Sequence, residues 1–176
     1  MFRNQILGLV MAAAAFAQGG PGTPVVAAAP TAEEAKQLSF MREEEKMARD
    51  LYRRFFAKYN VAIFDRIAKS EQTHFEAIGR LLERYNLADP AVELKEGEFR
   101  NADLLALYQQ LAAKGDASLE DALAVGALVE KTDIADLENS LKVVEKFDIK
   151  RVFNNLMAAS YNHLEAFEEC WQVSAQ

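Results

Sequence analysis

Residues 38–55 have the sequence LSFMREEEKMARDLYRRF, and this stretch decides the fold. Alternating steps of three and four residues trace one line of side chains along it. Such a line is typical of the seam by which a helix packs into a bundle. We therefore predict a helix over about residues 33–59. Its seam consists of Leu38, Met41, Glu45, Ala48, Tyr52 and Phe55.

The same alternation runs through three further segments, at about residues 61–86, 119–146 and 149–173. Each of these seams is apolar at both ends and polar in the middle. Because midpoints of antiparallel helices meet at one level, we expect the polar positions to share one layer of the core. They are Glu71 and His74, then Glu130 and Asp133, then Ser160 and His163.

The connections between the segments predict the topology. Short turns join the first segment to the second and the third to the fourth, whereas residues 87–117 form a long connection. Inside it, residues 102–114 predict a short amphipathic helix that ends at Gly115. With no strand pattern, the fold class is all-α: a ferritin-like four-helix bundle of two antiparallel hairpins joined by a long crossover with a short extra helix. We expect the N-caps of the later long helices at Asn60, Ser118 and Asp148.

Composition and the N-terminal residues indicate an exported protein. The net charge of −7 argues against nucleic-acid binding, which needs a basic surface. Residues 1–17 resemble a signal peptide with a short apolar stretch and cleavage after Ala17. Residues 18–32 are rich in Gly, Pro and Ala and predict a disordered linker, which leaves 33–173 as the folded domain. We expect a periplasmic or secreted protein with no membrane attachment after cleavage, and we expect the single cysteine, Cys170, to be a buried apolar residue.

The polar layer predicts a metal site. Carboxylates are costly to bury unless they are paired or neutralised, and no Lys or Arg lies on any of the four seams. A multivalent cation would neutralise them. Mixed carboxylate and imidazole ligands suit iron or manganese, with zinc also acceptable. By contrast, Glu43 and Glu44 leave the seam, and we expect them on a solvated face.

Several motifs resemble those of known metal proteins. The stretch from Glu45 to Tyr52, EKMARDLY, is similar to the first-helix motif of rubrerythrins and bacterioferritins, and Glu71-Gln-Thr-His74 resembles their second-helix ExxH. The pair Glu130 and Asp133 is similar to the paired acids on the third helix of rubrerythrins. Residues 159–163, ASYNH, followed by Phe167, resemble their fourth helix. As a whole, residues 38–167 resemble the ferritin-like family called domain of unknown function 2202.

This resemblance implies a ligand set. One metal would use Glu45, Glu71 and His74, and a second would use Glu130, His163 and a shared oxygen of Glu71. Asp133 could reach either metal. Ser160 stands where the family template has a bridging Glu, so the second position is expected to be weaker.

The resemblance leaves three functions open. The first is a di-metal protein that acts on peroxide or oxygen. The second is a non-catalytic single-metal protein for binding, storage or sensing. The third is a structural or interaction bundle with a vestigial site. Metal ions and a small oxidant are the expected partners, and a homodimer remains open.

Overall fold

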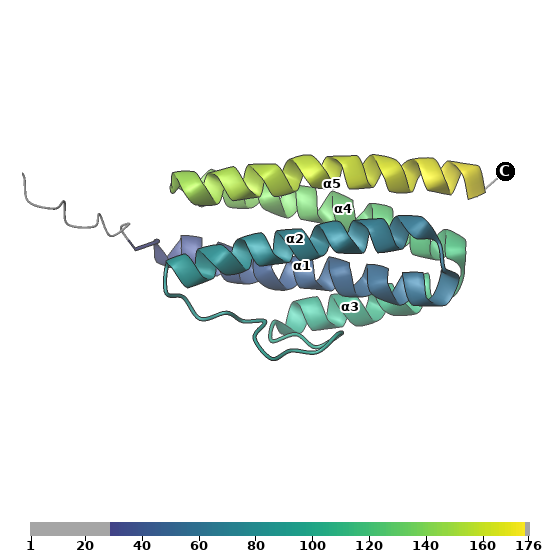
Figure 1. The fold of residues 1–176 in the computed structure, drawn as a ribbon, viewed down its shortest axis with the longest axis horizontal. Coiled ribbons are helices and arrows are strands. Elements are labelled where there is room, and N and C mark those ends of the chain that lie inside the picture. The colour runs from purple at the N-terminus through teal and green to yellow at the C-terminus, as the bar shows by residue number, and fades with distance from the viewer. Residues whose placement is uncertain (1–28, 175–176) are drawn as a thin grey trace, which may run out of the picture.

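The computed structural model describes residues 29–174, and within this part of the chain every regular element is a helix. The predicted all-α bundle is therefore confirmed (Figure 1). The predicted signal peptide and residues 18–28 lie outside the described residues. None of the described helices combines the length and apolar character needed to span a membrane. The helices are α1 (Ala32–Tyr59), α2 (Ala62–Arg84), α3 (Ala102–Gly115), α4 (Leu119–Val143) and α5 (Phe147–Ser174).

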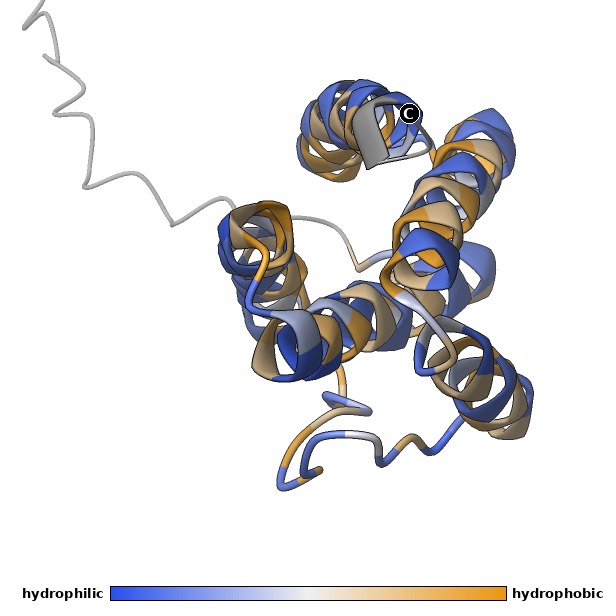
Figure 2. Cartoon of the chain, turned by 90° about the vertical axis from the view of Figure 1, so that its right-hand side faces the viewer, coloured by the Kyte–Doolittle hydropathy of each residue, from blue (hydrophilic) through white to orange (hydrophobic). Residues whose placement is uncertain are grey.

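The helices associate mainly in two pairs. α1 packs along α2 and α4 packs along α5, while the shorter α3 lies against α1 and α4 (Figures 1 and 2). The seam predicted from the sequence is the buried face of α1, since all six of its residues are almost fully buried. The period of three and four residues therefore identified which face of α1 packs inward.

The core consists of two apolar clusters, one on each side of a polar layer. The first apolar cluster includes Tyr52, Phe55, Phe64, Leu123 and Phe167. The second apolar cluster includes Leu38, Met41, Ile78, Leu137 and Phe153. Cys170 was expected to be buried, but it is only partly buried against the first cluster. The polar seam positions lie between the clusters, so the apolar packing fixes the positions of the helices that hold them.

Two of the three predicted N-caps are wrong. Asn60 ends α1 in the left-handed conformation, with φ 52°, and Val61 precedes α2 without a side-chain cap. The turn is so short that one residue must reverse the chain, and Asn tolerates this conformation. Asp148 lies inside the first turn of α5, where its carboxylate accepts hydrogen bonds from Tyr85 and Arg84. Ser118 does cap α4, because its hydroxyl accepts the backbone N–H of Asp121 at 3.0 Å.

The outer face of α1 is buried as well, which corrects the expectation that Glu43 is solvated. Glu43 is 4% exposed, and its carboxylate accepts the backbone N–H groups of Arg100 and Asn101. Close by, the ammonium of Lys46 donates to Asp50 at 2.6 Å and to the carbonyl of Lys95 at 2.7 Å. The connection between α2 and α3 therefore covers this side of α1, and charged groups of α1 satisfy its backbone.

We expect Asp50→Asn to destabilise the fold by about 3–5 kcal/mol, because it leaves the ammonium of Lys46 buried without its partner. Asp65→Asn is a matched control, since Asp65 pairs with Lys69 at the same spacing on an exposed surface. It should cost less than about 1 kcal/mol. Urea unfolding of both variants measures the difference. Equal losses of stability in the two variants would show that the buried pair of Lys46 and Asp50 does not stabilise the connection between α2 and α3.

Candidate metal centre

Each of the four long helices places acidic or imidazole side chains in the polar layer between the apolar clusters. Glu45 of α1 joins Glu71 and His74 of α2 in a first group whose ligand atoms all lie within 4.8 Å of one another. Glu130 of α4 and His163 of α5 join Glu71 in a second group with the same spread. The structure therefore brings together five of the six predicted site residues, and Glu71 belongs to both groups.

The two carboxylate oxygens of Glu71 face different groups. Nδ1 of His74 lies 2.7 Å from Oε2 of Glu71 and 3.3 Å from Oε2 of Glu45. Nδ1 of His163 lies 2.8 Å from Oε1 of Glu71 and 3.4 Å from Oε2 of Glu130. The two imidazole rings are stacked, with centroids 5.7 Å apart. Glu71 thus has the position of a carboxylate shared between two adjacent sites.

Several nitrogen and oxygen atoms of the two groups have no hydrogen-bond partner among the described residues, although they lie close to one another. In the described part of the chain, Oε1 of Glu45, Oε1 of Glu71 and Nδ1 of His163 are buried without a hydrogen-bond partner. The short approach of His163 to Glu71 is therefore not directed as a hydrogen bond. Two ligands bound about 2.1 Å from one ion lie about 3.0–3.4 Å apart in octahedral or tetrahedral geometry. The separations of the nitrogen and oxygen atoms are close to this range, so both groups fit metal coordination.

Tyr52 fixes the orientation of Glu130. Its buried hydroxyl donates to Oε1 of Glu130 at 2.6 Å, which leaves Oε2 directed to the second group. Burial, followed by the charges of Glu130 and Glu71, raises the pKa of Tyr52 well above its usual value, so the phenol stays protonated. The ring of Tyr52 packs against Phe167, with centroids 5.1 Å apart. A support of this kind holds a ligand in one conformation.

Asp133, the sixth predicted residue, belongs to neither three-residue group. Its Oδ2 accepts the hydroxyl of Ser160 at 2.6 Å, while its Oδ1 is buried without a partner. Among nearby charges, Asp133 has the largest effect on the pKa of Glu45. Asp133 is therefore held beside the first group by Ser160.

Glu44 is a member of this environment that the sequence pattern missed. It was expected on a solvated face, but it is 2% exposed, and its Oε2 lacks a hydrogen-bond partner. Burial, then the charges of Asp133, Asp136 and Glu45, raises its pKa well above the usual value. The only available indication in the sequence was the run of three acids at 43–45, which by itself fits a solvated helix face equally well.

The imidazoles and the shared carboxylate stabilise each other as charged groups. Burial alone raises the pKa of Glu71, but the close imidazoles of His163 and His74 outweigh it and bring the pKa to about 2. Burial lowers the pKa of both histidines, and their carboxylate neighbours reverse this. The pKa of His74 rises to about 11 and that of His163 to about 9. Without a metal, two imidazolium ions would therefore surround an ionised Glu71.

The remaining carboxyls tend to keep their protons. Burial and the charge of Glu71 raise the pKa of Glu130 to about 8. Burial raises the pKa of Asp133 to about 7, although the hydrogen bond from Ser160 opposes this. The pKa of Glu45 is also raised, first by burial and then by Asp133. A cation would replace these protons, so binding and deprotonation are coupled.

The fold and the site define an all-helical bundle with buried carboxylate and imidazole groups that could hold metal ions. The chain belongs to the family described as "Uncharacterized protein domain (DUF2202)", whose model matches residues 34–173. It is 49% identical over 139 residues to the uncharacterized protein MJ0754 of Methanocaldococcus jannaschii, covering 78% of this chain and 75% of the relative.

Two solved structures are similar to this bundle. The crystal structure of hypothetical protein MJ0754 aligns with a TM-score of 0.81 at 43% identity, covering 90% of this chain and 88% of that chain. A crystal structure of a DUF305 fragment from Deinococcus radiodurans aligns with a TM-score of 0.61, covering 82% of this chain and 98% of the fragment. At 12% identity, the second similarity concerns the fold alone.

We expect the metal-free protein to lose a few kcal/mol of stability as the pH rises from about 5 to about 9. Glu130, Asp133 and His163 have pKa values of about 8, 7 and 9, all above their ordinary values. A group with a raised pKa stabilises the fold while it is protonated, and this contribution disappears as the pH passes the raised value. Glu71, with a lowered pKa, acts in the opposite sense only near pH 2–4.5 and stays constant in this window.

Thermal melting of chelator-treated protein across this range measures the effect. With metal present the loss should be smaller, because deprotonated ligands bind metal more tightly. A metal-free protein that gains stability over the same window would contradict the predicted protonation states.

Proposed function

We propose that this chain is a ferritin-like metal-binding protein that holds two transition-metal ions in its polar layer. The first group, Glu45, Glu71 and His74, would hold one ion. The second group, Glu71, Glu130 and His163, would hold the other. Glu71 would bridge them, since one of its oxygens faces each group.

One observation carries the proposal. Five buried side-chain atoms lack a hydrogen-bond partner in the described part of the chain, and all belong to these ligands or to Glu44 and Asp133 beside them. An unpaired buried polar atom costs about 1–3 kcal/mol, and charged groups cost more. Such a concentration in one layer is expected where an ion supplies the missing partner.

The donor set favours iron or manganese, with zinc acceptable, because carboxylate oxygen and imidazole nitrogen suit these ions. When bound, a pair of redox-active ions would supply electrons for a reaction with peroxide or oxygen. Around them, Tyr52 fixes the orientation of Glu130 and the apolar clusters exclude bulk water. Glu130 and Asp133, with pKa values near neutrality, are suited to accept or release protons.

A non-catalytic, single-metal role is the second candidate, and Ser160 is the observation that favours it. By the resemblance to rubrerythrins and bacterioferritins, the position of Ser160 would carry a carboxylate. The neutral hydroxyl of Ser160 stands there instead, and it donates a hydrogen bond to one oxygen of Asp133. Two cations about 3.5–4 Å apart repel strongly, and each missing carboxylate removes negative charge that would offset this repulsion. Storage or sensing would then use the first group alone.

Export remains part of the proposal. Residues 1–17 would be removed, and the mature protein would bind its metal in the periplasm or outside the cell. N-terminal sequencing of the protein isolated from its native host would test this, with a start at Gln18 as the expected result.

Elemental analysis after reconstitution with ferrous, manganous or zinc salts should find about one to two ions per chain. Glu45→Gln should lower the metal affinity at least about tenfold, because it removes a ligand of the first group. Glu43→Gln is the control on the same helix, since Glu43 contacts the connection rather than the groups. Less than a tenth of an equivalent of every metal in the natural protein would rule out the proposal.

The two positions should be unequal. The first group should bind its ion more tightly, because Asp133 provides extra negative charge beside it. His74→Ala removes a ligand of this tighter position and should therefore abolish most metal binding. His163→Ala should leave one tight ion, and Ser160→Glu should strengthen the second position. Calorimetric titration of the three variants measures this. Two equal ions in the natural protein, unaffected by Ser160→Glu, would contradict the inequality.

A further inference from the structure

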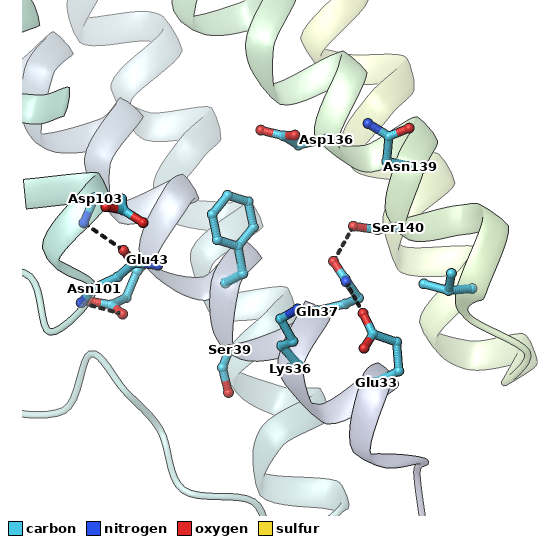
Figure 3. A pocket seen from close by; sticks show the side chains of 12 residues that line it. Glu33, Lys36, Gln37, Ser39, Glu43, Asn101, Asp103, Asp136, Asn139 and Ser140 are labelled. Carbon is cyan, nitrogen blue, oxygen red and sulfur yellow. Dashed lines mark hydrogen bonds between the residues drawn. The ribbon is translucent and has the colours of Figure 1, made fainter.

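The candidate metal centre is buried, so cations need a route to it. A pocket with mostly acidic charged residues lies between the N-terminal half of α1, the C-terminal half of α4 and the start of α3, and has a volume of about 590 Å³. We call it the acidic pocket. Its charged lining consists of Glu33, Glu43, Asp103 and Asp136 against one basic residue, Lys36 (Figure 3).

Asp136 connects this pocket to the interior. Figure 3 shows its carboxylate extending from α4 toward α1, across from Glu43 and Asp103. The buried Glu44 of α1 is close enough to Asp136 to interact with it electrostatically, and it interacts in the same way with Asp133 and Glu45. Glu44 therefore lies between a residue of the pocket wall and two residues of the candidate metal centre.

The packing of Glu44 gives no structural reason for a carboxylate there. It is 2% exposed, its Oε2 has no hydrogen-bond partner, and three acidic residues, Asp133, Asp136 and Glu45, act on it electrostatically. The buried basic residues on the same helix have other partners: Lys46 and Arg49 pair with Asp50, and Arg42 pairs with Asp89. A buried group of this kind destabilises the fold unless a proton or a cation neutralises it.

We propose that divalent cations enter through the acidic pocket and pass from Asp136 to Glu44 and then to Glu45 and Asp133. This inference rests on the proposed metal-binding function. Glu44 is a transit group rather than a ligand of either resting site, because it belongs to neither three-residue group. Negative charge along a low-dielectric path raises the local cation concentration and the rate of entry.

A pocket elsewhere on the surface has the opposite charge. The one between α2 and α5 is lined by Arg80, Arg84 and Arg151 together with Asp148. Its basic lining repels cations. Another route is direct entry beside His163, whose side chain is 12% exposed. The two routes differ in whether Glu44 and Asp136 affect the rate.

The test is stopped-flow uptake of Co²⁺ by the metal-free full chain, followed by visible absorption, together with equilibrium titration. Glu44→Gln and Asp136→Asn should each slow uptake about threefold to tenfold, while the dissociation constant changes less than about twofold. Glu138→Gln is the matched control, because Glu138 lies on α4 but is exposed and bonded to Tyr161. It should leave the rate unchanged. Added sodium chloride should slow Co²⁺ uptake by the natural protein more than uptake by the Asp136→Asn variant.

The outcomes separate this inference from the function on which it rests. No Co²⁺ bound by the natural protein at equilibrium would refute the metal-binding proposal itself. Normal binding with equal uptake rates in all variants would overturn the acidic route and favour entry beside His163. A loss of affinity as large as the loss of rate would also overturn it, by making Glu44 a resting ligand. Asp136 is only half-buried, so its variant keeps the test decisive even if Glu44→Gln perturbs folding.

Discussion

Repulsion between buried carboxylates is the constraint around which the bundle is organised. Glu45, Glu71, Glu130 and Asp133 occupy one layer of the core between two apolar clusters. At about 4 Å, two such charges repel by about 4 kcal/mol at an effective dielectric constant of 20. The two imidazoles and retained protons offset part of this in the protein alone. The apolar clusters on either side supply the packing that holds the layer together.

The sequence predicted the inner half of this arrangement well. Leu38, Met41, Ala48, Tyr52 and Phe55 lie on the buried face of α1, and Glu45 lies in phase with them. A helical period places every residue relative to its neighbours, so one correct seam orients a whole helix. The polar seam positions of four helices then meet because their midpoints share one level. Whether they bind metal is a chemical question that the period does not answer.

The outer half could not be predicted, for a physical reason. A period identifies the face that packs against other long helices, but it does not show what an irregular connection covers. Residues between α2 and α3 lie over the outer face of α1 and bury Glu43, Lys46 and Asp50, which look like surface residues in the sequence. Their partners are backbone groups of the connection, and backbone groups leave no pattern in a sequence. Glu44 was misplaced for a different reason: it is buried beside Asp133 and Asp136 of α4, one residue away from the predicted seam. The turn at Asn60 depended on a backbone angle rather than a side-chain preference.

The division of the candidate ligands between the helix pairs has a consequence for the order of assembly. Glu45, Glu71 and His74 all belong to the pair α1 and α2, so residues 45–74 contain the complete first group. The second group needs Glu71 from that pair together with Glu130 and His163 from the other. A chain synthesised from its N-terminus completes the first group before the residues of the second have been made. An ion in the first position would therefore act on a local hairpin during folding, and an ion in the second would join the two halves of the finished molecule.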